Sequence, residues 1–368
     1  MRYDYLIVGS GLFGSTFARL AAESGKTCLV VEQRDHFGGN VHSENIEGIE
    51  VHTYGPHIFH TNDEDIWQWV NKFSEFVPYV YSPKAIGSDG KMYSLPFNMN
   101  TFNEIWGIQK PEHAKLAISM SASENDNPQN LEEQAVSFVG YLIYEKLIKH
   151  YTKKQWMKDP KDLPASIIKR LPVRMTFDNN YFNDKYQGIP RHGYTEFMRS
   201  ILDHENIDVS LNTKFNKEDW DDIADRIVYT GKIDEYFNYC HGELEYRTLR
   251  FETEILDTDN HQGVAVINDC TPDNPWTRTI EHRHFDKYCR SLKTVITRET
   301  PDVWSRNKIP YYPINDNHNT QMFKQYEILA LKEQNVIFGG RLSEYRYYDM
   351  HQVIGSAMAK WEKENERI

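Results

Sequence analysis

The segment Gly9-Ser10-Gly11-Leu12-Phe13-Gly14 decides the fold, because it sets a GxGxxG pattern between a strand pattern and a helix pattern. Residues 5–8 form a short apolar run typical of a buried parallel strand, and residues 12–24 repeat apolar side chains at helical spacing. Residues 28–31 are again apolar, and Glu32 stands at their carboxyl end, about twenty residues after the motif, where an acid accepts hydrogen bonds from an adenosine ribose. This order predicts the first half of a Rossmann-type α/β domain.

Each glycine of the motif has a separate task in a nucleotide-binding turn. Gly9 permits the tight turn, Gly11 leaves the backbone open to a pyrophosphate, and Gly14 lets helix and strand pack closely. The N–H groups at the start of the helix, around Leu12 and Phe13, add partial positive charge toward the phosphates. The motif therefore predicts a dinucleotide site.

The residues after Glu32 favour FAD over NAD. The stretch Gln33-Arg34-Asp35-His36-Phe37-Gly38-Gly39-Asn40 resembles the extended fingerprint of FAD-dependent, amine-oxidase-like proteins, in which paired glycines let the chain pass close to the flavin diphosphate. Residues 227–231 and 336–341 resemble the second and third FAD-contacting strands of that group. The resemblance implies cofactor contacts at Gln33, Gly39, Asn40, Gly231, Gly340 and Arg341.

Composition limits the classes of function. A chain of 368 residues suggests two or three folding units. A net charge of -12 argues against nucleic-acid binding through the overall field, although a small anion needs only local cations. The four cysteines show no CxxC or zinc spacing, which fits a reducing cytoplasm, and no stretch approaches the roughly 20 apolar residues of a membrane helix. We expect a cytoplasmic protein without a membrane span.

Two blocks of different pattern interrupt the nucleotide-binding half. Residues 98–154 read as helices, the clearest of them at 130–150. The buried face expected for the helix at 130–150 consists of Ala135, Phe138, Val139, Leu142, Ile143, Leu147 and Ile148. Residues 244–309 read as strands, at 247–255, 263–267, 277–283 and 292–297.

This order predicts a discontinuous Rossmann-like domain that carries two insertions. The expected limits are 1–79, 195–240 and 318–368 for the FAD-binding domain, 98–165 for an inserted helical bundle, and 80–97, 166–194 and 241–317 for an inserted twisted antiparallel β-sheet.

The remaining landmarks resemble bacterial UDP-galactopyranose mutases along nearly the whole chain. They are Tyr54-Gly55-Pro56-His57-Ile58-Phe59-His60-Thr61-Asn62, Leu95-Pro96-Phe97-Asn98, Tyr151-Thr152-Lys153-Lys154-Gln155-Trp156, Phe177-Asp178-Asn179-Asn180-Tyr181, Tyr311-Tyr312-Pro313-Ile314-Asn315, Gly339-Gly340-Arg341 and Tyr347-Tyr348-Asp349-Met350-His351-Gln352. The resemblance implies a homodimer that interconverts the pyranose and furanose forms of a nucleotide sugar. In that family reduced flavin N5 attacks the anomeric carbon and the nucleotide diphosphate leaves, without net oxidation, so an external reductant such as NAD(P)H is expected.

A diphosphate leaving group calls for cations and hydroxyl donors. By resemblance, Arg278 bridges the diphosphate, and Tyr312 and Tyr347 donate hydrogen bonds to it. Arg170 matches the arginine of the family's mobile loop, and Arg174 is the second choice for that role. A surface ion pair is the alternative for any single arginine here.

The nucleoside end resembles the family on the helical insert, at Tyr151, Thr152, Gln155 and Trp156. An aromatic ring can stack on uracil and an amide can pair with its edge, although Tyr151 and Trp156 could instead serve helix packing. Tyr181 and Asn268 also match substrate-side positions. Leu147 and Ile148 depart from the family, because some members have aromatic residues there, and this predicts looser packing of the base.

The flavin end involves the segment from His57 through Ile58 to His60. His60 is expected to contact flavin or sugar, whereas for His57 a structural role is equally open. Asp349 and Met350 begin the last helix, whose positive end would face the flavin, and Arg341 would add a cation there. No carboxylate or third histidine is spaced along the sequence to join the two histidines, so no metal is predicted.

Two other functions stay open. An oxidoreductase of the amine-oxidase-like group would explain the FAD fingerprint but not the arginine and tyrosine set, and a nucleotide-sugar binding protein would have no need of FAD. Within the mutase hypothesis, UDP-galactose is the default substrate. UDP-N-acetylgalactosamine or a deoxythymidine-linked 6-deoxysugar is the alternative.

Overall fold

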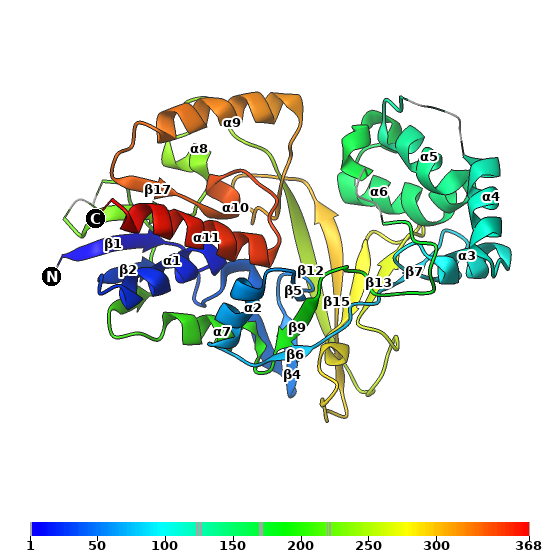
Figure 1. Cartoon of the computed structure of the whole chain (residues 1–368), viewed down its shortest axis with the longest axis horizontal. Coiled ribbons are helices and arrows are strands. Elements are labelled where there is room, and N and C mark those ends of the chain that lie inside the picture. Colours follow the sequence, from blue (N-terminus) through cyan, green and yellow to red (C-terminus); the bar gives the residue numbers. More distant parts are fainter. Residues whose placement is uncertain are drawn as a thin grey trace.

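A parallel sheet of five strands is built from stretches that lie far apart in the sequence (Figure 1). The structure is a computed structural model that describes residues 2–122, 125, 127–168, 172–218, 220 and 222–367. In spatial order the strands are β10 (Ile207–Ser210), β2 (Cys28–Val31), β1 (Tyr3–Val8), β11 (Ala224–Tyr229) and β17 (Val336–Phe338). The predicted Rossmann-like α/β fold is therefore confirmed, with its strands drawn from the start, middle and end of the chain.

Helices cover both faces of this sheet because the side chains of β1 alternate between them. Helices α1 (Leu12–Glu23), α7 (Gly193–Leu202) and α11 (Met350–Asn365) pack on the face that buries Tyr5, where Phe17 and Trp361 complete an aromatic cluster with ring centroids 5.4 to 6.0 Å apart. On the other face, α8 (Ile233–Tyr236) and α9 (Asn317–Ala330) pack through Tyr236 and Tyr326. The short α10 (Gly340–Ser343) follows β17.

Two smaller sheets flank the α/β core. The hairpin of β3 (Ser43–Ile46) and β4 (Ile49–His52) follows the one-turn helix η1 (Gly39–Val41). A three-stranded sheet joins β5 (Phe59–Thr61), β9 (Tyr186–Pro190) and β6 (Phe76–Pro78), with α2 (Glu64–Asn71) between β5 and β6 in the chain. Residues 186–190 thus pair with strands from the first 79 residues, which brings the chain around 184 beside β5.

A seven-stranded sheet, antiparallel except for one pair, forms a wall beside the α/β core (Figure 1). Its order is β16 (Tyr312–Pro313), β12 (Tyr246–Leu256), β15 (Thr294–Asp302), β14 (Arg278–Glu281), β13 (Val266–Asp269), β7 (Lys84–Ile86) and β8 (Met92–Ser94). The predicted strand at 277–283 is shorter in the structure, because the helical turn η5 (His282–Phe285) begins where that strand was expected to continue.

A helical unit stands apart from the parallel sheet and packs on the edge of the seven-stranded sheet (Figure 1). It contains α3 (Met99–Trp106), α4 (Pro111–Ser121), α5 (Leu131–Ile143), the π-helical turn η2 (Tyr144–Ile148) and α6 (Lys149–Trp156), followed by the short turns η3 (Pro160–Asp162) and η4 (Ala165–Ile168). Lys154 fastens α6 to the sheet, because its Nζ lies 3.1 Å from Asp269 Oδ1 and donates to the Trp276 carbonyl at 2.9 Å.

The buried face predicted for residues 130–150 is wrong at two positions. Phe138 and Leu142 are 37% and 38% exposed. The prediction assumed one straight helix, but Gly140 has a φ of 78°, and the π turn that follows changes the helical phase. A Cβ at Gly140 would lie 1.9 Å from Ser121 Oγ, so α4 and α5 approach each other closely at this point.

Among the described residues, no helix is long and apolar enough to cross a membrane.

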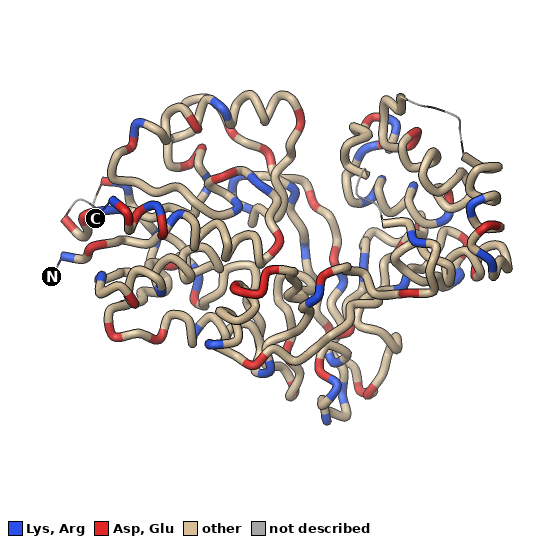
Figure 2. Tube along the Cα trace, viewed as in Figure 1, with Lys and Arg blue, Asp and Glu red and all other residues tan. Residues whose placement is uncertain are grey.

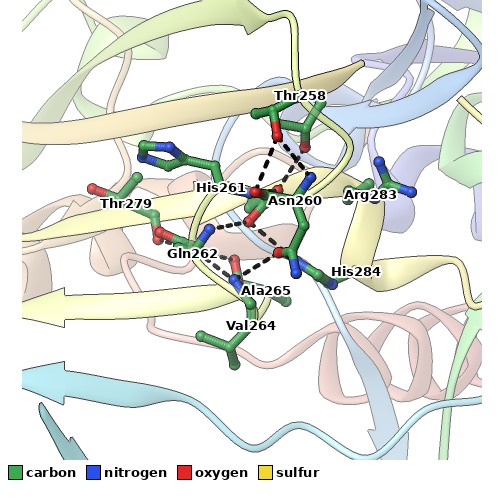
Figure 3. A network of polar contacts seen from close by, with 12 residues as sticks. Thr258, Asn260, His261, Gln262, Val264, Ala265, Thr279, Arg283 and His284 are labelled. Carbon is green, nitrogen blue, oxygen red and sulfur yellow. Dashed lines mark hydrogen bonds and ion pairs between the residues drawn. The ribbon is translucent and has the colours of Figure 1, made fainter. Parts of the chain in front are cut away.

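A buried carboxylate organises the loop between β12 and β13. Glu281 accepts hydrogen bonds from the backbone N–H groups of His261 and Gln262, at 2.8 and 2.7 Å, and from the Thr294 hydroxyl at 2.8 Å. His284 Nε2 lies 3.1 Å from the same carboxylate. Figure 3 shows this loop, in which Asn260, His261 and Gln262 lie close to His284. Burial by itself would raise the pKa of Glu281, but these hydrogen bonds hold it at about 2.

Glu281→Gln is expected to destabilise the fold. The folded pKa of Glu281 lies below its usual 4.5, so its contribution is fully present above pH 4.5 and is lost as pH falls toward 2. At pH 7 the substitution should lower the free energy of unfolding by about 2 to 3 kcal/mol, measured by urea denaturation. As a control, Glu254→Gln breaks only the exposed pair with Arg298 and should cost less than about 1 kcal/mol. Equal losses in the two variants would contradict the role given to Glu281.

Candidate active site

One large cavity of about 2030 Å³ lies among the parallel sheet, the seven-stranded sheet and the helical unit. Apart from Arg174, the second choice for the loop arginine, every described residue that the sequence predicted for the cofactor or the substrate lines it. Arg170 lies outside the described residues. Lys, Arg, Asp and Glu are mixed along all parts of the chain (Figure 2), so local cations rather than a general positive field must attract an anionic ligand.

The glycine motif forms a backbone cradle at one end of the cavity. A Cβ added at Gly14 would lie 2.1 Å from the Gly9 carbonyl oxygen, so this glycine is required for packing. A Cβ at Gly11 would meet nothing within 4 Å, which leaves open space over the N-terminus of α1. Gly9 has a φ of +101°, a conformation that favours glycine. This division of roles is the one predicted from the sequence, and it fits a pyrophosphate above Gly11.

Glu32 is buried beside this cradle. Its carboxylate accepts hydrogen bonds from the Ser10 N–H at 3.0 Å, the Ser10 hydroxyl at 2.9 Å and the Arg34 N–H at 3.0 Å. A carboxylate has about four acceptor positions, so capacity for a ribose hydroxyl remains. The Arg34 guanidinium donates to Asn40 Oδ1 at 2.9 Å and stands 4.6 Å from the centre of the Tyr54 ring, which orders the predicted Gly38-Gly39-Asn40 turn.

The start of α11 forms another end of the cavity, where the sequence predicts the flavin ring. Asp349 is the N-cap residue, and its backbone N–H donates to Gln352 Oε1 at 2.9 Å. The Arg341 guanidinium donates to the Tyr311 carbonyl, while its buried Nε has no partner among the described residues. A planar ligand with acceptor oxygens on one edge fits between a helix N-terminus and this cation.

A chain of buried imidazoles connects the His57 segment to the seven-stranded sheet. The backbone N–H of His57 donates to the ring Nδ1 of His52 at 3.1 Å, and the backbone N–H of His52 donates to the ring Nδ1 of His282 at 3.2 Å. His282 Nε2 in turn lies 2.8 Å from the Thr297 hydroxyl. Burial lowers the pKa of His57 to about 4 and that of His282 to about 3. The interactions around His57 therefore position the backbone of this segment.

His60 belongs to a different group of side chains. The His60, Asp349 and His351 side chains approach so closely that their possible ligand atoms lie within 4.8 Å of one another. His60 Nδ1 lies 2.7 Å from Asp184 Oδ2. Spacing along the sequence did not suggest this group, because Asp349 and His351 come from the last helix and reach His60 only in the folded chain.

Arg278 on β14 is the central cation of the cavity. Burial opposes its charge, but the carboxylate of Glu299 and the hydroxyls around it outweigh that effect and raise its pKa well above the ordinary value. Its Nε lies 3.5 Å from Glu299 Oε1, and its Nη2 donates to the Tyr151 hydroxyl at 2.9 Å. Asn268 is its register partner on β13. The guanidinium is thus charged, held in place and directed into the cavity.

Tyr312 and Tyr347 lie together near Arg278, with ring centroids 5.5 Å apart. Burial raises the pKa of the Tyr312 phenol, and the cavity wall has the same effect on the pKa of Tyr347, although Tyr347 is 55% exposed. Both hydroxyls are therefore protonated at neutral pH and can donate hydrogen bonds. The Arg341 guanidinium carbon lies 5.7 and 5.8 Å from the two ring centres. Two donors and two cations therefore meet around one part of the cavity, as anion binding requires.

Helix α6 carries the residues predicted for the nucleoside. Thr152 is buried, and it lines the cavity together with Tyr151, Gln155 and Trp156. Arg247 was not predicted as a site residue, but it lies in the same wall, with its guanidinium carbon 4.6 Å from the centre of the Trp156 ring. Its buried Nε has no partner among the described residues, and the strand pattern around it gave no signal of this.

Arg174 serves a structural role in this state. Its guanidinium donates to the carbonyl oxygens of Asn180 and Tyr181, the latter at 3.0 Å. The side chain therefore positions Tyr181, which lines the cavity. This arrangement leaves Arg170 as the stronger prediction for a mobile-loop cation.

The profile of the family described as UDP-galactopyranose mutase matches residues 146–347, more than half of the chain. The chain belongs to this family. A second profile, for an NAD(P)-binding Rossmann-like domain, matches residues 7–73. A protein of Klebsiella pneumoniae named "Probable UDP-galactopyranose mutase" is 42% identical, over 96% of this chain and 93% of that protein. The dTDP-fucopyranose mutase of Escherichia coli is 41% identical, over 96% of each.

Solved structures agree on the fold. A reduced UDP-galactopyranose mutase superimposes with a TM-score of 0.75 at 13% identity, covering 100% of this chain and 95% of that one. A variant of putrescine oxidase gives a TM-score of 0.59 at 12% identity, covering 100% and 99%. The fold is therefore shared with oxidases, and membership in the mutase family rests on the sequence matches.

Membership in the UDP-galactopyranose mutase family settles the cofactor and the class of reaction. The protein is a mutase that interconverts pyranose and furanose forms of a nucleotide sugar, and its cofactor is FAD. The cradle above Gly11, the acceptor Glu32 and the cap of α11 fit the phosphates, the ribose and the ring of FAD.

Two alanine substitutions separate packing from cofactor binding. Gly14→Ala forces a Cβ against the Gly9 carbonyl and should lower the free energy of unfolding by more than about 2 kcal/mol. Gly11→Ala places its Cβ in open space and should leave apoprotein stability within about 0.5 kcal/mol, yet lose FAD on gel filtration. Urea denaturation and the flavin absorbance of the eluted protein measure the two effects. FAD retention by Gly11→Ala would contradict the cradle.

Because His57 and His282 are buried, we expect the folded protein to lose stability in acid. Their folded pKa values lie below the usual 6.5, so their contribution to stability is full above pH 6.5 and falls as pH drops toward 4. At pH 5 each should reduce the free energy of unfolding by about 2 kcal/mol. His282→Gln should flatten this pH dependence in urea denaturation, whereas the same change at exposed His318 should not. An unchanged slope in His282→Gln would contradict the assignment.

Proposed function

We propose that the protein interconverts UDP-galactopyranose and UDP-galactofuranose. One arrangement carries this proposal: Arg278 stands between the cofactor end of the cavity and the nucleoside end on α6. A nucleotide sugar with its base against Trp156 would have its diphosphate at Arg278 and its sugar at the flavin end. An amine-oxidase-like oxidoreductase has no use for a buried arginine with tyrosine donors at that position.

The side chains around the diphosphate position the substrate and stabilise the leaving group. Arg278 neutralises the charge that develops when the bond between the anomeric carbon and the diphosphate breaks. Tyr312 and Tyr347, both protonated, donate hydrogen bonds to the same group, and Arg170 would supply a second cation. When bound and reduced, FAD would supply a nucleophile for the anomeric carbon, and the residues around the cavity would hold the sugar within its reach.

The proposed reaction causes no net oxidation or reduction of the flavin or of the sugar. A reductant such as NAD(P)H is therefore needed only to bring the flavin to its active state, and not in stoichiometric amounts. A cytoplasmic location, where such reductants are present, fits this requirement.

A homodimer is part of the proposal. Large apolar side chains are exposed on the helical unit, at Leu116 and Met120 of α4 and at Tyr141 of α5. Exposed apolar groups of this kind mark candidate interfaces. Analytical ultracentrifugation of the wild type and of Met120→Asp would test whether this face joins two copies.

A second candidate substrate follows from the comparisons. The dTDP-fucopyranose mutase of Escherichia coli is 41% identical, close to the 42% of the Klebsiella pneumoniae protein. The same chemistry on a deoxythymidine-linked 6-deoxysugar is therefore the first alternative, and on UDP-N-acetylgalactosamine the second.

The activity is tested by anion-exchange chromatography of UDP-galactofuranose incubated with the purified protein, before and after reduction by dithionite. Conversion to the pyranose only in the reduced sample is expected. Conversion of a deoxythymidine-linked 6-deoxysugar alone would favour the second candidate. Consumption of reductant with each turnover would contradict a mutase.

Arg278→Ala should abolish catalysis without releasing the cofactor. Loss of the main cation at the leaving group is expected to lower kcat by about 1000-fold or more, while flavin absorbance stays at the wild-type ratio to protein. Arg298→Ala on the adjacent strand removes an arginine that pairs with exposed Glu254, and it should retain activity. Near-wild-type turnover of Arg278→Ala would reject the assigned role.

A further inference from the structure

Asp184 meets His60 across two strands of the small sheet. His60 lies on β5 and pairs in register with Gln187 of β9, and Asp184 comes just before β9. This pairing brings Asp184 Oδ2 to 2.7 Å from His60 Nδ1. The second carboxylate oxygen accepts a hydrogen bond from Asn62 Nδ2 at 2.6 Å. Both oxygens of Asp184 are therefore engaged, and the carboxylate is held in a fixed orientation.

The His60 ring is fixed on its other sides by aromatic contacts. It stacks on Phe182 with ring centroids 3.8 Å apart and an angle of 13°, and His351 meets it edge to face at 5.2 Å. Because Nδ1 donates to a carboxylate, the neutral ring carries its proton there and leaves Nε2 as a free acceptor. The contacts thus select one tautomer and one orientation.

The ring lies where cofactor and sugar must meet. His60 lines the cavity together with Asp349 and Met350 at the start of α11, and with Tyr181 and Phe182 on the substrate side. The reacting sugar must occupy this junction, because its anomeric carbon has to reach the cofactor while its diphosphate stays at Arg278.

We propose that Asp184 is a positioning residue that holds His60 ready to exchange protons with the sugar during ring opening and reclosure. This inference rests on the proposed pyranose–furanose reaction. A carboxylate at Nδ1 fixes the imidazole and stabilises the imidazolium whenever Nε2 carries a proton, as it does in catalytic triads. Sequence alone gave no signal of Asp184, because its partner is more than a hundred residues earlier in the chain.

The proton balance at the two sugar oxygens closes with a single imidazole. In ring opening the C1–O5 bond breaks and its electron pair goes to O5; His60 enters this step as the imidazolium that Asp184 stabilises, gives its Nε2 proton to O5, and becomes the neutral form that keeps its proton on Nδ1. In reclosure a lone pair of O4 forms the new bond to C1, and the O4 proton returns to Nε2. One proton is given and one is taken, so His60 ends the turnover as it began and no oxidant or reductant is consumed.

The first test uses the oxidised, FAD-bound enzyme without substrate, so that it does not depend on the proposed function. Selective ¹⁵N-histidine labelling and long-range ¹H–¹⁵N spectra report the His60 tautomer, with His60→Gln used for assignment. The wild type should show the proton on Nδ1. Asp184→Ala should show a mixture of tautomers, and Asp184→Glu should restore the Nδ1 form. An unchanged His60 signal in Asp184→Ala would overturn the positioning role.

The second test separates proton exchange from substrate binding. Asp184→Asn keeps the shape of the side chain and should lower kcat by about 100-fold with KM within about two-fold, and it should increase the solvent deuterium isotope effect on kcat. Asp208→Asn makes the same change at a surface carboxylate bonded to Tyr3 and should leave all three values unchanged.

Three outcomes of the second test would overturn the proposal. They are an unchanged kcat in Asp184→Asn, a loss confined to KM, and an unchanged isotope effect. Activity that disappears on dialysis against EDTA and returns with Zn²⁺ would also overturn it, because His60, Asp349 and His351 would then act as metal ligands. If the wild type converts no nucleotide sugar but the tautomer test holds, the proposed substrate fails while the positioning role stands.

Discussion

The buried charge of Arg278 constrains the active site more than any other single feature. A guanidinium that is largely removed from water is costly unless it is paired. The Arg278 side chain is 20% exposed, its Nε lies 3.5 Å from Glu299 on the neighbouring strand, and its Nη2 donates to the Tyr151 hydroxyl on α6. Glu299 belongs to the seven-stranded sheet and Tyr151 to the helical unit. The two interactions of Arg278 therefore also hold the helical unit against this sheet. In a chain of net charge -12, this local arrangement is what makes a diphosphate site possible.

The cofactor end of the cavity depends instead on a position without a side chain. Gly11 leaves open space where Gly14 leaves none, so one motif both packs the sheet and exposes backbone N–H groups. The strands that complete this end come from the start, middle and end of the chain. The insertions must therefore fold back onto the parallel sheet before the cavity exists. Catalytic groups then meet at the junction, where His60 lies between the cofactor and the sugar.

Local pattern was enough to predict β1, α1 and β2, the cofactor turn and the cap at Asp349, because each depends on residues close in sequence, whereas the edge strand β10 was not predicted. The resemblance to known mutases supplied Arg278 and the tyrosines. Contacts between distant segments could not be predicted in this way. Arg247 of β12 reaches Trp156 only because α6 packs against the seven-stranded sheet, and Asp184 reaches His60 only through the pairing of β5 with β9. The exposed Phe138 shows the same limit within one helix, since the kink at Gly140 changes which face is buried.

We expect one cavity to hold both FAD, at the glycine cradle, and a nucleotide diphosphate, at Arg278. A crystal structure of the FAD-bound protein with UDP would show whether it does. We expect diphosphate oxygens within about 3 Å of the Arg278 guanidinium, with the base beside Tyr151 and Trp156. UDP bound elsewhere, or a diphosphate out of reach of Arg278, would contradict the account of the site and of the reaction drawn from it.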